Sequence, residues 1–103
     1  MKTQECVARF IVEHSLETSI VYRALDVSSE AGEVAKAILH ETSYGHRQMQ
    51  SYQELYKELG DVYFALLALA SQANIDLENA LYDTLRKYEQ RKDVTGCIAS
   101  DNA

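Results

Sequence analysis

Two pairs of carboxylates occur in this sequence at the spacing of one helical turn. Glu30 and Glu33 form the first pair, and Glu58 and Asp61 form the second. Residues three apart lie on the same face of a helix, so each pair presents its two side chains together. Four carboxylates gathered at one place, with no histidine or cysteine beside them, are hard oxygen ligands that suit Mg²⁺ or Mn²⁺ rather than zinc or copper. The two pairs therefore predict a magnesium site.

The segments around the two pairs repeat one another. Residues 26–38 read DVSSEAGEVAKAI and residues 54–66 read ELYKELGDVYFAL, with acids, a glycine and an alanine at matching positions. Gly32 and Gly60 occupy the same place in both copies, and glycine in a helix interior costs about 1 kcal/mol relative to alanine. We expect the two glycines to allow a close approach between helices.

On a helical wheel each copy carries an apolar stripe with the acids along one side of it. The predicted stripes are Ile20, Val27, Ala31, Val34 and Ile38 in the first copy, and Leu55, Leu59, Val62, Leu66 and Leu69 in the second. Like charges crowded beside an apolar stripe are destabilising unless something neutralises them. We expect the stripes to pack antiparallel and bring both acidic flanks over one cleft, where the small Ala37 and Ala65 leave room for a ligand.

The predicted metal points to a class of substrate. Mg²⁺ usually binds proteins through few carboxylates together with substrate phosphates, so a nucleotide polyphosphate is the expected substrate. The metal would polarise a phosphoryl oxygen and prepare a water for attack. Di-iron chemistry is disfavoured because neither copy has the histidine of a Glu-x-x-His motif. A non-catalytic helical binding module is the competing hypothesis, since acids spaced in this way also occur on solvated helix faces.

Two further acids lie one turn before the pairs. Asp26 and Glu54 are each a candidate for the base that activates water, or for a carboxylate that supports the metal ligands. Glu54 has another explanation, because Ser51 and Glu54 have the spacing of a helix capping box. Asp26 has no such explanation and is the better candidate.

The two motifs resemble those of a known enzyme family. Residues 29–34 read SEAGEV and residues 58–62 read ELGDV. Together they are similar to the MazG-like branch of the all-α nucleoside triphosphate pyrophosphohydrolases, whose pattern is E-E-x-x-E, a spacer and then E-x-x-D. The resemblance covers about residues 18–92.

The resemblance implies a specific reaction and a role for the four carboxylates. In that family the corresponding acids bind Mg²⁺, and the reaction hydrolyses a nucleoside triphosphate, often a deoxynucleotide, to the monophosphate and pyrophosphate. Such an activity clears unwanted or excess nucleotides from the cell. Related substrates in the same superfamily, namely dUTP, dCTP or phosphoribosyl-ATP, remain alternatives.

Other positions match the family less closely. The first glutamate of the E-E doublet is Ser29 here, so one carboxylate of the pattern is missing. Lys87 and Arg91 loosely match a lysine and an arginine of the family and would contact phosphates, although solvated charges at a helix end explain them equally well. Tyr22 and Tyr56 are candidates for stacking on a nucleobase, although aromatic residues at helical spacing are more often part of a core or an interface.

Helical periodicity predicts an all-α fold. The sequence has no proline, and four helical segments are expected at about 3–14, 18–41, 51–72 and 76–92, with Asn74 or Asp76 capping the last. Short connections favour an antiparallel helical bundle of about four helices. The fourth segment is expected to point Leu77, Leu81, Leu85 and Tyr88 inward.

The third segment predicts an assembly, because it is apolar on more than one side. Tyr63, Phe64 and Leu67 lie off its stripe, and a chain of this size leaves much apolar surface uncovered. We therefore expect oligomerisation, as a homodimer or a homotetramer, to complete the bundle.

Length and charge bound the remaining possibilities. The chain of 103 residues is expected to form one domain over 1–103, with a motif-bearing core at about 18–92 and a loose tail at 93–103. A net charge of −6 disfavours nucleic acid as a partner. No apolar run is long enough to cross a membrane, and the first residues lack the layout of a signal peptide. Cys6 and Cys97 are expected to be free thiols, which agrees with a cytoplasmic location.

Overall fold

Four helices make up the part of the chain that can be described. The computed structural model describes the backbone of residues 2–95 and the side chains of residues 2–92. The helices are α1 (Lys2–Glu13), α2 (Ile20–Glu41), α3 (Gln53–Gln72) and α4 (Leu77–Thr95), and the described residues contain no strand. The predicted all-α class and the four helices are confirmed. Most of the predicted loose tail, from residue 96 onward, lies outside the described residues.

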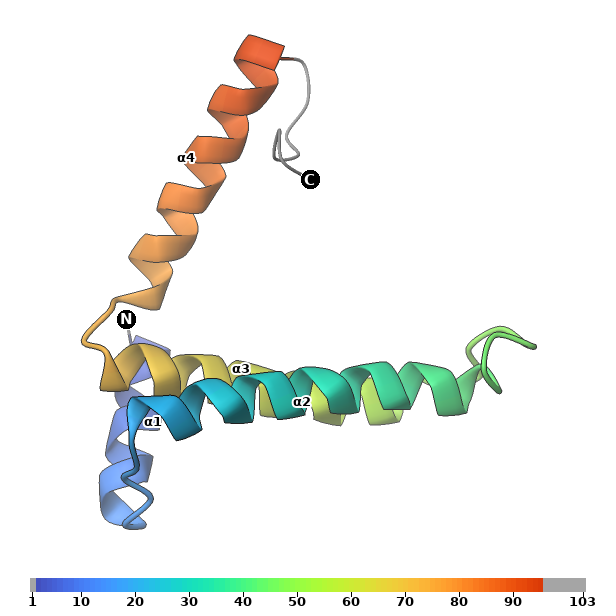
Figure 1. Cartoon of the computed structure of the whole chain (residues 1–103), viewed down its shortest axis with the longest axis horizontal. Helices are drawn as coiled ribbons and strands as arrows, with labels where there is room; N and C mark the ends of the chain where they lie inside the picture. The colour runs from blue at the N-terminus through green and yellow to red at the C-terminus, as the bar shows by residue number, and fades with distance from the viewer. Residues whose placement is uncertain (1, 96–103) are drawn as a thin grey trace.

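Helices α2 and α3 lie side by side and run antiparallel, forming the long layer of the molecule (Figure 1). The loop that joins them is tied to the end of α2 at Glu41. The Nε atom of Arg47 donates a hydrogen bond of 2.9 Å to the Glu41 carbonyl, and the Gln50 amide donates one of 3.1 Å to the Glu41 carboxylate. Gly45 within the loop has a φ of 89°, which glycine adopts without strain. The loop reverses the chain and sets which residues of α2 face α3.

The seam between α2 and α3 is rotated from the predicted stripes toward the acids. The buried or half-buried positions along it are Arg23, Val27, Glu30, Val34 and Ala37 on α2, and Leu55, Glu58, Val62, Ala65 and Leu69 on α3. Ala31 is exposed, and Leu59 and Leu66 are 51% and 37% exposed. The prediction that the acids flank the seam is therefore wrong for Glu30 and Glu58, which lie within it, whereas Asp61 is exposed at its edge. The rotated faces carry the small Ala37 and Ala65, which favour close packing of two helices.

Helix α1 crosses α3 near the end that is farthest from the α2–α3 loop (Figure 1). Phe10 and Phe64 meet edge to face, with ring centroids 5.9 Å apart. Ile11 is buried, and Leu67 is only 1% exposed. The second apolar side of α3 is thus covered partly by the chain's own first helix, and Leu59, Tyr63 and Leu66 remain exposed on a third side.

Helix α4 leaves the body of the molecule instead of folding back along it (Figure 1). Asn74, with a φ of 56°, lies in the turn before it, and Asp76 caps it by accepting a hydrogen bond of 3.1 Å from the Asn79 amide. The predicted cap at Asp76 is confirmed. The chain has a radius of gyration of 16.8 Å, whereas a compact domain of this length has about 13 Å.

The prediction that the apolar side chains of α4 point inward is wrong within one chain for three of the four residues, since only Leu77 is half-buried. Leu81, Leu85 and Tyr88 are 53%, 48% and 38% exposed. Along its length α4 makes few contacts with the other described helices. Its apolar stripe therefore remains available to another molecule.

The two glycines do not serve a close approach within this chain. A Cβ atom added at Gly32 or Gly60 would meet nothing within 4 Å. Both residues are exposed, because the seam is rotated away from them. The predicted close helix approach at these glycines is therefore wrong for the single chain.

The predicted capping box at the start of α3 is also absent. The Ser51 hydroxyl accepts a hydrogen bond of 3.2 Å from the Gln53 amide. Tyr52 occupies the N-cap position and makes no side-chain cap. Glu54 instead forms an ion pair with Lys57, with an N–O distance of 3.4 Å. The capping explanation for Glu54 therefore does not hold.

Within residues 2–95, none of the helices combines the length and the apolar character needed to cross a bilayer.

Candidate metal and nucleotide site

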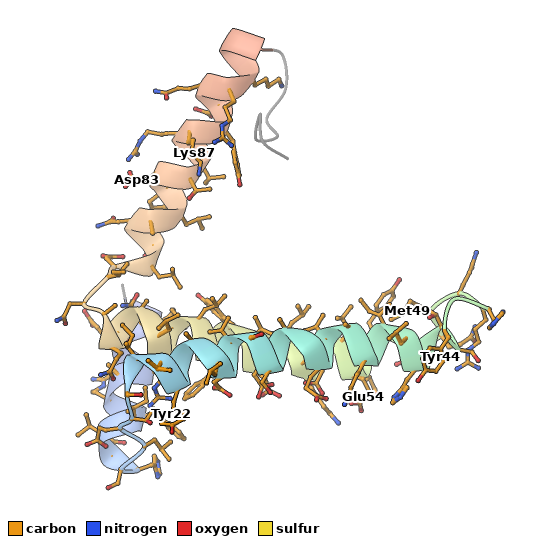
Figure 2. The ribbon with its side chains drawn as sticks, viewed as in Figure 1. Tyr22, Tyr44, Met49, Glu54, Asp83 and Lys87 are labelled. Carbon is orange, nitrogen blue, oxygen red and sulfur yellow. The ribbon has the colours of Figure 1, made fainter. Side chains whose placement is uncertain are left out.

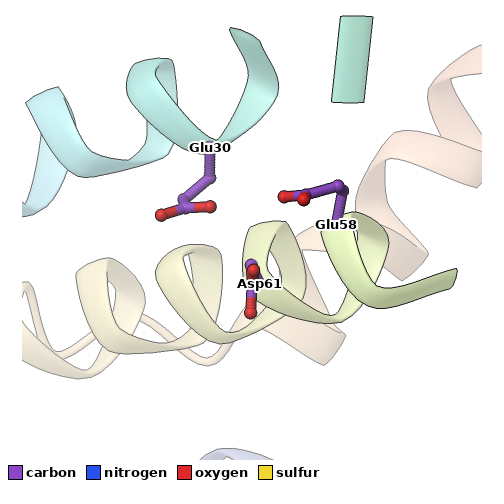
Figure 3. Close-up of side chains that lie close together, drawn as sticks. All are labelled: Glu30, Glu58 and Asp61. Atoms are coloured by element: carbon purple, nitrogen blue, oxygen red, sulfur yellow. The ribbon is translucent and has the colours of Figure 1, made fainter. Parts of the chain in front are cut away.

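Three carboxylates meet between α2 and α3. Oxygen atoms of Glu30, Glu58 and Asp61 lie within 4.8 Å of one another. Figure 3 shows Glu30 extending from α2 toward α3, which carries the other two residues. Glu30 and Glu58 are half-buried in the seam, whereas Asp61 is exposed at its edge. The antiparallel pairing thus brings together three of the four predicted metal ligands.

The electrostatics of this cluster centre on Glu30. Partial burial raises the pKa of the Glu30 carboxyl above its ordinary value of 4.5, and the negative charge of Asp61 raises it further. Asp26, Glu58 and Glu33 act on the pKa of Glu30 in the same direction. Four neighbouring acids therefore disfavour a negative charge on Glu30. A bound cation would relieve that repulsion, so the donor set fits a hard divalent metal.

Glu33 lies beside the three-carboxylate cluster and outside it. Its carboxylate pairs with Lys36 on the next turn, with an N–O distance of 3.7 Å. It also faces a cavity of about 340 Å³ that adjoins the cluster through Glu58. The cavity is lined by Glu33, Lys36, Ala37, His40, Glu41, Glu54 and Glu58.

The two alanines of the repeat have different surroundings. Ala37 lines the cavity, as expected for a residue that leaves room for a ligand. Ala65 is only 1% exposed and is buried in the seam, so the expectation that it borders an open space is wrong. The two copies of the repeat are therefore not equivalent in the folded chain.

The two candidate bases differ in their surroundings. Asp26 is half-buried, one turn before Glu30, and its charge acts on the pKa of Glu30. The side chain of Glu54, labelled in Figure 2, is 61% exposed and forms an ion pair with Lys57. It also lines the cavity. Ser29, which replaces the first acid of the family's doublet, is exposed on α2.

The two tyrosines lie on opposite sides of the cluster. Tyr22, in the first turn of α2, is 65% exposed. It precedes Glu30 by two turns, which corresponds to about 12 Å along the helix. Tyr56 is 81% exposed and, with Tyr52, borders a shallow hollow of about 600 Å³ at the start of α3. Within one chain the two tyrosines do not border one base-binding place.

Lys87 and Arg91 lie on the projecting helix. Both stand over the ring of Tyr88, with the Lys87 Nζ atom 5.4 Å and the Arg91 Cζ atom 5.7 Å from its centroid. Figure 2 shows Lys87 on α4, away from the α2–α3 layer. The structure therefore does not bring these two cations to the acids of the same chain.

Three residues of the cavity were not predicted from the sequence: Glu41 and two residues with nitrogen-bearing side chains, Lys36 and His40. Both follow Glu33 on the same face of α2, at the third and seventh positions after it. That spacing is a signal that could have identified them. They place positive or titratable groups beside an otherwise acidic cavity.

Comparison with known families decides what kind of domain this is. A model of the MazG nucleotide pyrophosphohydrolase domain matches residues 22–95. The chain belongs to this family. The match spans α2, α3 and α4, so this MazG domain contains every carboxylate of the cluster, whereas α1 precedes it. No curated protein and no solved structure matches the chain.

Membership of the MazG family confirms the resemblance carried by residues 29–34 and 58–62. It also suggests what the acid cluster does. Nucleotide pyrophosphohydrolases act on phosphates, and both phosphates and carboxylates are negatively charged, so a cation is needed to bring them together. In this MazG domain, the oxygen atoms of Glu30, Glu58 and Asp61 lie close enough together that one cation could contact all three.

Proposed function

We propose that this MazG domain is a Mg²⁺-dependent nucleoside triphosphate pyrophosphohydrolase. It converts a nucleoside or deoxynucleoside triphosphate into the monophosphate and pyrophosphate. The observation that carries this proposal is the convergence of the oxygen atoms of Glu30, Glu58 and Asp61 to within 4.8 Å in a chain of this family. In the cell the activity clears unwanted nucleotides, and we place it in the cytoplasm.

Glu30, Glu58 and Asp61 would hold the cation, and Glu33 would join them when its ion pair with Lys36 opens. Carboxylates without histidine or cysteine favour Mg²⁺, with Mn²⁺ as the next candidate. When bound, the cation polarises a phosphoryl oxygen and lowers the pKa of a nearby water. The half-buried seam keeps Glu30 and Glu58 in place for this role.

The adjoining cavity of about 340 Å³ receives the phosphate chain. Ala37 keeps it open, and Lys36 and His40 offer groups that bind phosphate oxygens. A water attacks phosphorus, its oxygen forms the new P–O bond, and the bond to the bridging oxygen breaks. Attack at either the α- or the β-phosphorus yields the same two products.

Asp26 accepts the proton of the attacking water in this proposal. Its half-burial and its influence on the pKa of Glu30 support this choice. Glu54 is the second candidate, and its ion pair with Lys57 and its exposure make it the weaker one. Ser29 cannot supply a carboxylate, so we assign the base to Asp26, with Glu54 as the alternative.

A second copy of the chain completes the molecule. Leu59 and Leu66 on α3, and Leu81 and Leu85 on α4, expose apolar surface that a homodimer or homotetramer would bury. Because α4 projects from the body, its cations would act on phosphates held by another copy. Lys87 and Arg91 are the two phosphate-binding residues of that arrangement.

Tyr56 is the proposed stacking partner for the nucleobase, because it borders a hollow at the start of α3, the helix that carries Glu58 and Asp61. Tyr22 lies two turns before Glu30 on α2. It would therefore contact a different nucleobase from Tyr56, or a nucleobase bound to another copy of the chain. Both side chains are well exposed and free to stack.

A substrate panel tests the proposed function. Pyrophosphate release is measured from each common NTP and dNTP, and from dUTP and phosphoribosyl-ATP, with Mg²⁺ and with a chelator. Mg²⁺-dependent release from a nucleoside triphosphate supports the proposal, and the preferred substrate separates it from the related hydrolases. No turnover of any nucleotide, with no effect of Mg²⁺ on thermal stability, would favour the non-catalytic helical module.

A further inference from the structure

The side chain of Gln4 joins the first helix to the turn before the last one. Its Nε2 atom donates a hydrogen bond of 2.6 Å to the carbonyl of Ile75. Its Oε1 atom accepts one of 3.0 Å from the amide of Leu77. One amide group thus binds the backbone on both sides of Asp76.

These bonds act at the point where α4 begins. The first amides of a helix have no acceptor within the helix and must find one elsewhere. Asp76 supplies a local acceptor for Asn79, whereas Leu77 receives its acceptor from Gln4, which is distant in the sequence. The start of α4 is therefore held both by its own cap and by α1.

Little else holds the direction of α4 within one chain. Between α4, α3 and the first turn of α1 lies an open groove of about 640 Å³, bordered by Thr3, Leu66 and Leu81 among others. Because α4 makes few contacts along its length, its direction is determined at its first turn. The turn contains Asn74 at a positive φ, and Gln4 fixes the two backbone groups that follow it.

We infer that Gln4 is a positioning residue that sets the direction of α4 and thereby presents Lys87 and Arg91 to the phosphates of the substrate. This inference rests on the proposed function for its catalytic consequence, and on the two hydrogen bonds for its structural part. The amide of glutamine serves both contacts at once, because Ile75 requires a donor and Leu77 requires an acceptor.

Two substitutions separate the hydrogen bonds from the shape of the side chain. Gln4→Met keeps a similar length and removes both bonds, whereas Gln4→Glu keeps the acceptor for Leu77 and removes the donor to Ile75. Gln72→Met is the matched control, since Gln72 is an exposed glutamine at the end of α3. Circular dichroism is used to check that each variant retains its helices.

The direction of α4 is measured as a distance between spin labels at Gln48 and Gln90. Both residues are exposed, one in the α2–α3 loop and the other on α4. The labels are placed in a Cys6→Ser, Cys97→Ser background, and labelled chains are diluted with unlabelled protein so that distances within one chain are read. We expect a narrow distribution for the parent and for Gln72→Met, a broad one for Gln4→Met and an intermediate one for Gln4→Glu. An unchanged distribution in Gln4→Met would overturn the inference.

The catalytic part is measured as steady-state pyrophosphate release. We expect Gln4→Met to raise KM about five-fold with little change in kcat, as for the loss of binding made equally to substrate and transition state. A broadened distance distribution with an unchanged KM would show that α4 does not act on the substrate, and would overturn the inference. If the unaltered protein hydrolyses no nucleotide, the proposed function fails, and the distance measurement alone decides whether Gln4 directs α4.

Discussion

At the scale of single residues, the main feature is a glutamate placed where an apolar side chain would pack better. Glu30 lies in the seam between α2 and α3 and shares its surroundings with four other acids. Placing like charges together destabilises the folded chain unless a cation neutralises them. Such an arrangement is typical of a binding site, where stability is given up for function.

The substitution Glu30→Gln tests this directly. The folded-state pKa of Glu30 lies above its ordinary value of 4.5. Its contribution to the free energy of unfolding is therefore present below pH 4.5 and is lost as pH rises through the raised pKa. We expect Glu30→Gln to raise the melting temperature of the metal-free protein at neutral pH, with a difference that shrinks as pH falls toward 4.5.

Melting curves with and without Mg²⁺ complete this test. The unaltered protein gains stability from Mg²⁺ and Glu30→Gln gains none, because one of the ligands is missing. Glu89→Gln, which removes an exposed acid of α4, serves as the control and should behave like the unaltered protein. A lower melting temperature for metal-free Glu30→Gln would contradict the electrostatic account.

The assignment of the base is a second prediction at this scale. Asp26→Asn should lower kcat by about 10² to 10⁴-fold, the usual contribution of a general base. Glu54→Gln, at the rim of the cavity beside Glu58, should change kcat only slightly. The reverse order of the two effects would assign the base to Glu54.

At the scale of the helices, the sequence predicted well where the four helices lie, and less well which faces of α2 and α3 pack against each other. The four segments were recognisable because their apolar residues recur with a helical period. The wheel placed Leu59 and Leu66 at the centre of the seam because they are large and apolar. Packing instead selected the face with Ala37 and Ala65, which brought the acids inward.

Two other features of the helices depend on contacts that no local pattern reveals. Glu33 separates from the other three acids because it lies farther around α2 and pairs with Lys36. The direction of α4 depends on the backbone at Asn74 and on Gln4 at the other end of the chain. Long-range side-chain contacts of this kind are not encoded in a window of neighbouring residues.

The exposed glycines lead to a prediction about helix stability. A methyl group at position 60 meets open space, so Gly60→Ala should raise the free energy of unfolding by about 1 kcal/mol through helix propensity. Chemical denaturation at low protein concentration measures this change. A loss of stability instead would indicate that Gly60 is needed for a close contact with a second copy.

At the scale of the whole molecule, the chain presents more apolar surface than a lone domain of its length normally leaves uncovered. The projecting α4 exposes Leu81 and Leu85, and α3 exposes Leu59 and Leu66 beside it. The acid cluster and the cations of α4 lie apart in one chain. Self-association would bury these leucines, and it would bring the cations of α4 in one copy close to the acid cluster of another.

Breaking the apolar stripe of α4 tests the assembly. Leu85→Lys should convert the protein from a dimer or tetramer to a monomer in light scattering, because it places a charge in the proposed interface. Its pyrophosphate release should fall together with assembly, since Lys87 and Arg91 no longer reach a neighbouring site. Gln90→Lys adds the same charge to an exposed position of α4 and should alter neither property. A monomeric parent protein with full activity would contradict this part of the account.

The most direct test of the central claim is Mg²⁺-dependent pyrophosphate release by the unaltered protein and by Glu58→Gln. Glu58 belongs to the carboxylate cluster and also lines the cavity. The substitution Glu58→Gln should therefore reduce turnover by about 10²-fold or more at every Mg²⁺ concentration. The Glu89→Gln control should retain full activity. Equal rates for Glu58→Gln and the unaltered protein would show that the cluster of Glu30, Glu58 and Asp61 is not where hydrolysis takes place.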